Sequence, residues 1–422
     1  MDPLLGRLVL VGSIKTIAVL GTLDTKGREM KFVKDIIESL GFRALVIDTG
    51  VTGKPFFKPD ISREEVAEAG GMSFRELMKN PSREVASPLM SRGASKLIGG
   101  MVKEGKVHGI ISMGGTQGTS LATAVMRSLP IGFPKVMVST IASGNTAPFV
   151  DIYDITMMHS VADILGLNPV TRKILSNAAH AICGMAESKE EIKVTDKPLV
   201  AVTTVGITTP CAMKAMELLE AWGCETIVFH AVGTGGRAME HLMKQGIVKA
   251  VLDIATIEVT NEMYGGLLAG GKERLTVAGR LGIPQVLAPG AIAILVFGEP
   301  ETVPEKYRDR KIIRHSPLIT DVRVTKEEQV KVAKELAKRL KSTKDPAVFM
   351  IPRKGYDSYS AEGKPFWEPE SDRAFVETLK MELPSNIEVI ELDYDINDPE
   401  FAREMVDALI KLMRRKDLLS PT

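Results

Sequence analysis

Cysteine is scarce in this chain of 422 residues, which contains only Cys183, Cys211 and Cys224. The three cysteines form no CxxC pair, and the six histidines show no spacing that is typical of a zinc site. These absences argue against a disulfide-stapled scaffold and against a zinc domain. They fit a reduced protein, and we expect it to be cytoplasmic.

The chain also lacks an excess of charge of either sign. It has 54 Lys and Arg residues against 53 Asp and Glu residues, which gives a formal net charge of +1. That balance gives no reason to expect nucleic acid or an anionic membrane as a partner. No uninterrupted apolar stretch is long enough to span a bilayer, and the apolar start is interrupted by Arg7 and Lys15, unlike a signal peptide.

The common catalytic and phosphate-binding motifs are missing as well. The sequence has no GxSxG, no HExxH, no kinase motif set, no Walker A loop and no clean GxGxxG. What it has is an apolar run from Val107, a glycine-rich turn at Gly114–Thr119, and a helical pattern from Ser120. Such a turn allows close backbone approach and exposes N–H groups at a helix start, which suits an anion. A tight connection without a ligand is the alternative, because such turns are common in α/β folds.

Short β-branched runs alternate with amphipathic helical patterns along the chain, which predicts an α/β fold with mainly parallel sheets flanked by helices. In the first half the predicted strands are Thr16–Leu20, Ala44–Asp48, Val107–Ser112 and Lys135–Ser139. The predicted helices there are Arg28–Leu40, which ends at Gly41, two short helices behind the capping boxes Ser62–Glu65 and Ser73–Glu76, and Ser82–Glu104.

The second half repeats this alternation. Its predicted strands are Leu199–Thr203, Thr226–His230, Ala250–Asp253, Gln285–Leu287 and Ala293–Val296, and its predicted helices are Cys211–Trp222, Arg237–Gln245 and Lys272–Leu281. From Lys326 onward we expect a helix, a strand at Ala347–Ile351, a loop at Pro352–Pro369, and a last strand and helix that complete the second sheet. The two halves show a weak internal repeat, and each opens as β-α-β. We therefore predict two Rossmann-like subdomains, residues 1–190 and 191–422, joined within the charged stretch Glu187–Lys197.

Polar residues follow each predicted strand of the first subdomain. In open α/β sheets ligands bind beyond the carboxyl ends of the strands. The segments at that edge are Gly21–Lys26, Asp48–Thr49, Gly114–Thr119 and Ser139–Thr146. We predict a site for a polyphosphate or a similar anion there, with Lys26 and Arg83 as its cations. The alternative is that these residues cap helices or face solvent.

The second subdomain has a glycine turn of its own, Gly233-Thr234-Gly235-Gly236-Arg237, which opens a predicted helix. This turn suggests a second ligand, a carboxylate or phosphate clamped by Arg237. Asp253 and Glu258 are candidate acid, base or metal-ligating residues, and His315 is a candidate proton donor. Tight turns and capping carboxylates are again the alternative.

Six segments together resemble one family, the Tm-one-like ATP-binding family. They are GTLDTK, GGTQGTS, RSLPIGFPKVMVSTIASGNT, VGITTPC, VFHAVGTGGRAME and VLDIATIEV, and the resemblance runs from about Lys15 to the end. It implies two Rossmann-like subdomains, with ATP and Mg²⁺ bound in the first. Carried over by motif, it places the nucleotide on Asp24, Thr25, Lys26, Thr49, Arg83, Gly114, Gly115, Thr116, Gln117, Gly118 and Thr119. The match is weakest around Thr49 and Arg83, and Thr116-Gln117 departs from the Ser- and Gly-rich loop of the family's plant member.

We therefore expect a cytoplasmic, homodimeric ATP-binding protein. It would act as an ATP-dependent enzyme on a small acidic metabolite, with the two sites facing each other across an interdomain cleft. The alternative is a nucleotide-binding regulatory or scaffold protein without turnover. A nicotinamide-dependent oxidoreductase is a third hypothesis, because Asp48 is placed to bind a ribose, although no proper GxGxxG accompanies it.

Overall fold

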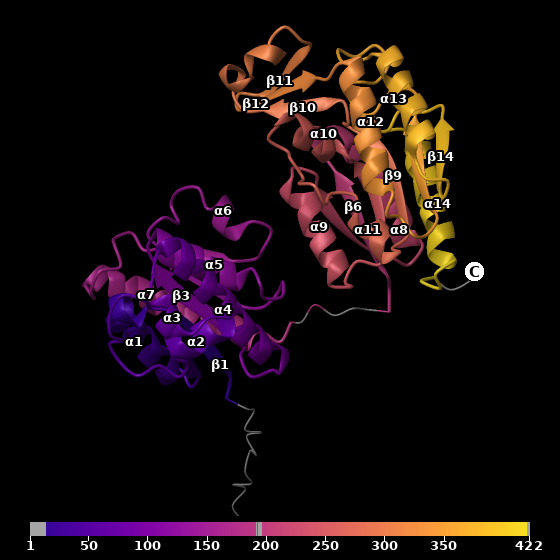
Figure 1. Ribbon diagram of the computed structural model, residues 1–422. Coiled ribbons are helices and arrows are strands. Elements are labelled where there is room, and N and C mark those ends of the chain that lie inside the picture. The colour runs from indigo at the N-terminus through magenta and orange to yellow at the C-terminus, as the bar shows by residue number, and fades with distance from the viewer. Residues whose placement is uncertain (1–13, 191, 193–195, 420–422) are drawn as a thin grey trace, which may run out of the picture. The chain divides into compact units, whose positions relative to one another are not determined.

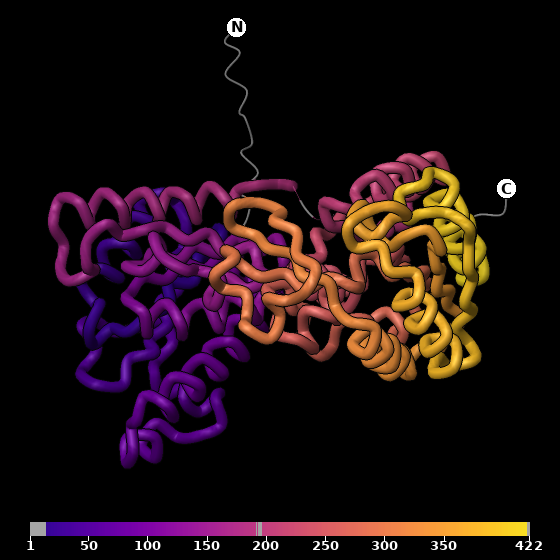
Figure 2. The backbone as a smooth tube through the Cα atoms, turned by 90° about the horizontal axis from the view of Figure 1, so that it is seen from above, coloured from indigo at the N-terminus to yellow at the C-terminus, as the bar shows by residue number. Residues whose placement is uncertain are grey.

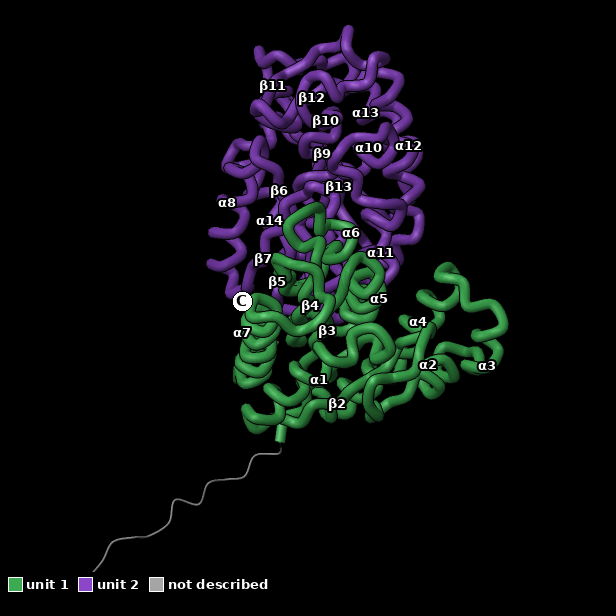
Figure 3. The backbone as a smooth tube through the Cα atoms, turned by 90° about the vertical axis from the view of Figure 1, so that its left-hand side faces the viewer, with its two compact units in different colours: residues 1–192 green, residues 193–422 purple. Residues whose placement is uncertain are grey.

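The computed structural model describes residues 14–190, 192 and 196–419. The chain divides into two compact units, unit 1 at residues 1–192 and unit 2 at residues 193–422 (Figure 3). Each unit is an α/β layer structure built on a parallel sheet, so the expected fold class is confirmed.

Unit 1 contains a five-stranded parallel sheet with the strand order β2-β1-β3-β4-β5. Figure 1 labels the helices that surround it, α1 to α7. Its strands are β1 (Thr16–Gly21), β2 (Arg43–Asp48), β3 (Gly109–Gly114), β4 (Lys135–Ser139) and β5 (Thr156–His159). Its helices are α1 (Leu23–Ser39), α2 (Arg63–Gly70), α3 (Phe74–Leu77), α4 (Arg83–Lys103), α5 (Thr116–Met126), α6 (Ala147–Val150) and α7 (Pro169–Glu187).

The strands of unit 1 are apolar on both faces, as expected for a parallel sheet that is covered by helices on both sides. Along β1, Ile17 and Val19 pack in one core with residues of α1 and α7. Ala18 and Leu20 pack in the other core with residues of α2, α4 and α5. Figure 2 accordingly shows α7 on one side of this unit and the α2–α4 region on the other. Both faces of the sheet are thus covered by helices, which leaves the carboxyl ends of the strands as the place for a ligand.

Unit 2 contains a six-stranded parallel sheet with the order β14-β13-β9-β8-β6-β7. Its strands are β6 (Leu199–Thr204), β7 (Glu225–His230), β8 (Ala250–Ala255), β9 (Gln285–Gly290), β13 (Ala347–Pro352) and β14 (Ile387–Leu392). Its α-helices are α8 (Thr209–Ala221), α9 (Thr234–Lys244), α10 (Ile257–Tyr264), α11 (Val277–Leu281), α12 (Lys326–Leu340), α13 (Pro369–Glu382) and α14 (Pro399–Arg414). The last two strands join the sheet as predicted.

A second, antiparallel sheet in unit 2 differs from the prediction. The apolar segment expected as a core strand at Ala293–Val296 is β10 (Ile294–Phe297), which pairs with β12 (Ile319–Arg323) in the order β10-β12-β11. The third strand, β11, spans Ile312–Ser316. An apolar run of four residues looks the same in either kind of sheet, so its pairing partner could not be read from the sequence.

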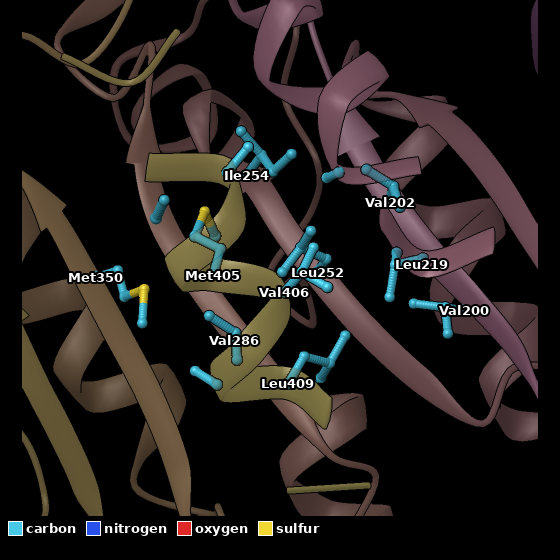
Figure 4. Packing of buried hydrophobic residues seen from close by; sticks show 14 of the residues in the cluster. Val200, Val202, Leu219, Leu252, Ile254, Val286, Met350, Met405, Val406 and Leu409 are labelled. Atoms are coloured by element: carbon cyan, nitrogen blue, oxygen red, sulfur yellow. The ribbon is translucent and has the colours of Figure 1, made fainter. Parts of the chain in front are cut away.

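The amphipathic helix α14 closes one face of the large sheet of unit 2. Its residues Met405, Val406 and Leu409 lie against residues of the strands, among them Leu252 and Val286 (Figure 4). These side chains are essentially inaccessible to solvent. The face is therefore filled by side chains and leaves the strand ends as the place for chemistry.

Both parallel sheets share one topological feature. In each, the first strand lies between the second and the third, as β2-β1-β3 in unit 1 and β7-β6-β8 in unit 2. The connections consequently leave the first strand in opposite directions, which opens a crevice at the carboxyl ends of the first and third strands.

Candidate functional sites

A pocket of about 120 Å³ lies at this switch point in unit 1. It draws on the segments after β1, β2 and β3 and on the first turns of α4. Its lining residues are Thr22, Thr49, Val51, Arg83, Ala86, Ser87, Met90, Met113, Gln117, Gly118 and Leu121. Four residues predicted to bind nucleotide, Thr49, Arg83, Gln117 and Gly118, are thus brought to one pocket.

Helix α5 begins at this pocket, four residues before the predicted start. Gly115 is its N-cap residue and makes no side-chain cap hydrogen bond. Gly114 has an internal reason to be glycine, because a Cβ there would lie 3.2 Å from the Cα of Gly118. Gly115 and Gly118 have no such reason: a Cβ at either would meet its nearest atom at 3.7 Å, an ordinary contact. Gly118 lies in the first turn of α5, where a glycine costs up to about 1 kcal/mol relative to alanine, whereas Gly115 is at the N-cap and carries no such cost. Both positions have space for a Cβ that the fold does not fill.

Thr119 has a structural role in the same helix. Its side chain is fully buried, and its hydroxyl donates to the Gly115 carbonyl (2.9 Å) and shares a hydrogen bond with the Ser139 hydroxyl (2.7 Å). This link ties the start of α5 to the end of β4. We therefore do not place Thr119 among the groups that line the pocket.

Three buried oxygen atoms beside the pocket accept or donate no hydrogen bond within the described residues: Asp24 Oδ1, Asp48 Oδ2 and Thr49 Oγ1. The other oxygen of Asp48 accepts from the N–H groups of Leu23 (3.0 Å) and Gly50 (2.8 Å). Asp24 Oδ2 holds the loop after β2, through Thr52 and Gly53. Buried polar atoms are rarely left without a partner, so this group of oxygens indicates a missing ligand, cation or proton.

The two carboxyl groups respond differently to burial. Burial raises the pKa of Asp48 above its usual range, and the nearby charge of Asp24 raises it further, against the hydrogen bonds from Leu23 and Gly50. Burial acts on Asp24 in the same direction, but the hydrogen bonds from Gly53 and Thr52 outweigh it and hold its pKa below the usual range. The site thus favours one negative charge over two, unless a cation is present.

Thr25 and Lys26 were also predicted to bind nucleotide, but neither lines the pocket. The ammonium group of Lys26 donates to the carbonyl of Ile164. The hydroxyls of Thr25 and Thr22 share a hydrogen bond of 2.6 Å. Arg83, at the start of α4, is exposed and lines the pocket, so it is the cation best placed for a ligand there.

The glycine turn of unit 2 already holds an anion that belongs to the protein. The carboxylate of Glu258 accepts from the N–H groups of Gly233 (2.6 Å) and Gly236 (3.1 Å). A Cβ at Gly235 would lie 1.8 Å from the His230 carbonyl oxygen, and one at Gly236 would lie 2.1 Å from Glu258. These glycines are therefore explained by internal packing. Arg237 donates to the Gly233 carbonyl (3.2 Å). The second ligand expected at this turn stays a prediction, and the groups expected to hold it have partners within the protein.

Asp253 and Glu258, proposed from the sequence as acid, base or metal ligands, instead form ion pairs with a buried arginine. The guanidinium of Arg274 donates twice to Asp253 (2.6 and 2.7 Å) and once to Glu258 (2.5 Å). All three side chains are at most 2 % exposed. Glu240 lies nearby and accepts from the Leu275 N–H, and burial raises its pKa to about 7 against the attraction of Arg274. Sequence reasoning missed Arg274, because nothing in its local sequence marks it as buried.

A second pocket, of about 170 Å³, lies at the switch point of unit 2. Its walls are mostly apolar, and its polar side chains are His230, His315 and Asp321. Of the three candidate catalytic residues, His315 lines this pocket, whereas Asp253 and Glu258 do not. Asp321 was not anticipated, because it lies in the middle of β12, where no strand-end argument applies.

Comparisons with known proteins match the chain in two parts. Residues 15–191 match the N-terminal domain, and residues 197–413 the C-terminal domain, of the Uncharacterised protein family (UPF0261). A UPF0261 protein of Clostridium tetani is 45% identical over 95% of this chain and 100% of its own length, and one of Rhizobium meliloti is 40% identical over 94% and 98%. The ToMV resistance protein Tm-1(GCR237) of Solanum lycopersicum is 35% identical over 93% of this chain and 55% of its own length. The resemblance to Tm-1 is thus confirmed, but the matched family is described as uncharacterised and not as ATP-binding, which corrects that part of the expectation.

Among solved structures, UDP-N-acetylglucosamine 2-epimerase from Rickettsia bellii covers 65% of this chain and 78% of its own, with 12% identity and a TM-score of 0.22. A likeness of that size transfers no function. Within the described residues, no helix is both long and apolar enough to cross a membrane.

Proposed function

We propose that this chain, which belongs to the uncharacterised protein family UPF0261, binds ATP with its terminal phosphates in the pocket of unit 1. The observation that carries the proposal is the combination, at one switch point, of a helix start without a side-chain cap, two glycines at which the fold would admit a Cβ, and the buried hydroxyl of Thr49, which has no hydrogen-bond partner among the described residues. The N–H groups of α5 suit phosphate oxygens, and Arg83 adds a positive charge beside them. The contrast with unit 2 supports this assignment, because there Glu258 fills the helix start.

Asp24 and Asp48 fit a magnesium ion that accompanies the nucleotide. Mg²⁺ in phosphate sites is commonly held by one or two carboxylates together with phosphate oxygens and water. Each of these residues has one buried oxygen without a partner among the described residues. A bound cation would also remove the repulsion between the two carboxylates. No group of three or more His, Cys, Asp or Glu side chains suited to a metal occurs in the described part of the chain, so phosphate and water would complete the coordination.

The direct test is calorimetric titration of the full chain with ATP, ADP and adenosine in the presence of Mg²⁺, with NADH as the competing hypothesis. We expect affinity to fall in the order ATP, ADP, adenosine, because each phosphate lost removes contacts with α5 and Arg83. Tighter binding of NADH than of ATP would instead support the oxidoreductase hypothesis. Release of phosphate over time then separates an ATP-dependent enzyme from a nucleotide-binding scaffold.

Replacing Asp48 with asparagine is expected to weaken Mg²⁺-dependent ATP binding by about tenfold or more, which is about 1.4 kcal/mol. An asparagine retains the oxygen that accepts from Leu23 and Gly50, so the fold should persist. The stability of the unliganded protein should change in the opposite direction. Burial raises the folded-state pKa of Asp48, so the wild-type chain loses stability as pH rises through that pKa, and the variant does not.

The measurements are calorimetry with and without Mg²⁺ and urea unfolding between pH 4 and pH 8. The proposed role of Asp48 would be contradicted by a variant that keeps full Mg²⁺-dependent affinity.

A matched pair of cation variants tests which side chain faces the phosphates. Arg83→Gln is expected to weaken ATP by about tenfold or more and to leave adenosine nearly unchanged, since a charge-assisted hydrogen bond is worth roughly 1.5–3 kcal/mol. Lys26→Met should change the affinity for ATP less, because Lys26 is engaged with the Ile164 carbonyl. Equal losses of ATP and adenosine affinity in Arg83→Gln would show that Arg83 acts on the pocket wall and not on phosphate.

An ATP-dependent reaction on a small acidic metabolite also stays a proposal. The expected small acidic metabolite, the homodimer and the facing of the two sites across a cleft are predictions that the contacts within each unit do not address. The alternative function, a regulatory or scaffold protein that binds ATP without turnover, is favoured by the ion-paired state of Asp253 and Glu258, which removes them as free catalytic groups.

A further inference from the structure

The pocket of unit 2 combines a hydrocarbon wall with a small polar edge. Its apolar lining comes from four parts of the unit and includes Val205, Ile257, Leu268 and Val296. No lysine or arginine occurs in the lining among the described residues. At about 170 Å³ the pocket is smaller than those that hold drug-sized ligands, which suits a small metabolite.

His315 is held at the polar edge by two partners on one side of its ring. Its Nδ1 lies 2.8 Å from the hydroxyl of Tyr359 and 3.7 Å from the carboxyl of Asp321. Burial raises the pKa of Tyr359, so the hydroxyl stays protonated and can donate to a neutral imidazole. In the tautomer in which Tyr359 donates to Nδ1, the hydrogen of the neutral ring is on Nε2. If the ring gains a proton, both nitrogens donate, and Nε2 again carries a hydrogen.

Asp321 supplies the charge balance for either state of the ring. Its side chain is 5 % exposed, and burial raises its pKa to about 6, with His315 opposing the shift and Asp357 adding to it. An ionised Asp321 beside a protonated ring would leave the site close to neutral overall.

We propose that this pocket binds a small, uncharged aliphatic carbonyl compound, with its hydrocarbon part against the apolar wall and its oxygen accepting a hydrogen bond from Nε2 of His315. The pocket and such a ligand are complementary in polarity and charge. The wall favours hydrocarbon, and the lack of a lysine or arginine in the described lining disfavours a free carboxylate or phosphate. Nε2 of His315 is an N–H donor in the protonated ring and in the neutral tautomer in which Tyr359 donates to Nδ1. Tyr359 and Asp321 are positioning residues in this arrangement. The proposal does not depend on nucleotide binding in unit 1.

The experiment titrates the full chain with pentan-2-one and, as charged counterparts of similar length, with pentanoate and pentylammonium. Ligand-observed NMR and calorimetry at pH 7.5 report affinity. We expect pentan-2-one to bind at least tenfold more tightly than either ion. Preference for pentanoate would overturn the proposal in favour of an acid site, and no difference between the three probes would overturn it as well.

Two variants locate the binding, and a third tests the tautomer of the imidazole. Gly206 lines the pocket, and a Cβ there would meet nothing within 4 Å, so Gly206→Leu should fill the pocket without disturbing the fold. We expect it to lower the affinity for pentan-2-one by tenfold or more, with an unchanged urea-unfolding transition as the control for folding. His315→Phe should weaken the ketone while keeping the ring volume. Tyr359→Phe should change the imidazole tautomer, which histidine ¹⁵N shifts report. Undiminished ketone binding in both Gly206→Leu and His315→Phe would overturn the assignment.

Discussion

Replacing Arg274 with methionine is expected to lower the free energy of unfolding of unit 2 by about 3–5 kcal/mol. The guanidinium of Arg274 is the ion-pair partner of both Asp253 and Glu258, and all three side chains are buried. Methionine would fill much of the volume but leave two carboxylates facing each other without water. Glu258 accepts hydrogen bonds from the N–H groups of Gly233 and Gly236, so a shift of its carboxylate would also disturb the glycine turn.

A matched control lies six residues further along the chain. Arg280 pairs with Glu273 at the surface, where both side chains are substantially exposed. Exposed pairs of this kind contribute about 0–1 kcal/mol, so Arg280→Met should be nearly neutral. The comparison holds the chemistry of the substitution constant and changes only burial. Urea unfolding followed by circular dichroism measures both variants.

Two further outcomes separate ionic from packing effects in Arg274→Met. Combining it with Asp253→Asn and Glu258→Gln removes the unpaired charges and should recover most of the lost stability. Lowering the pH to 5 should reduce the deficit, because burial raises the pKa of the neighbouring Glu240 to about 7, and its protonation removes a third negative charge from the cluster. A loss of 1 kcal/mol or less in Arg274→Met would contradict the ionic account, as would a triple variant no more stable than the single one.

The contrast between Asp253 and Arg274 shows where sequence reasoning about sites reaches its limit. A strand-end carboxylate is visible in the sequence because the strand itself is visible. Its partner is not, because Arg274 lies 21 residues further along and reaches the site through the packing of α9, α10 and the loop that follows. Whether a polar strand end serves a ligand or an internal ion pair is thus decided by tertiary contacts.

More of the fold than of the candidate site could be predicted from the sequence, for physical reasons that differ between elements. The strand at Lys135–Ser139 was placed correctly because its run of buried residues is bounded by Pro134 and a polar loop. The long helix α7 was not predicted, although Asn168 and Thr171 form a capping box at its start. The start of α5 was predicted four residues late, because glycine propensity argued against a helix that tertiary contacts nevertheless impose.

Unit 1 offers a variant whose effects on stability and on binding should have opposite signs. Gly118→Leu is expected to weaken ATP by about a hundredfold or more, about 2.7 kcal/mol, because a branched side chain would occupy the space beside the start of α5. The same change replaces glycine by a good helix former and should raise the free energy of unfolding by up to about 1 kcal/mol. The fold tolerates the Cβ, whose nearest neighbour would be the Met113 carbonyl oxygen at 3.7 Å.

Gly99→Leu is the matched control. Gly99 lies in the interior of α4, a Cβ there would meet nothing within 4 Å, and the residue does not line the pocket. It should gain helix stability to a similar degree and keep full affinity for ATP. Calorimetry measures binding, and thermal unfolding measures stability. If folded Gly118→Leu kept full ATP affinity, the proposal that the nucleotide binds in the α5 pocket would be wrong. Equal losses of ATP affinity in both variants would instead show that helix substitution disturbs the unit as a whole. Loss in Gly118→Leu alone, accompanied by a gain in stability, is the result that only a ligand seated at Gly118 predicts.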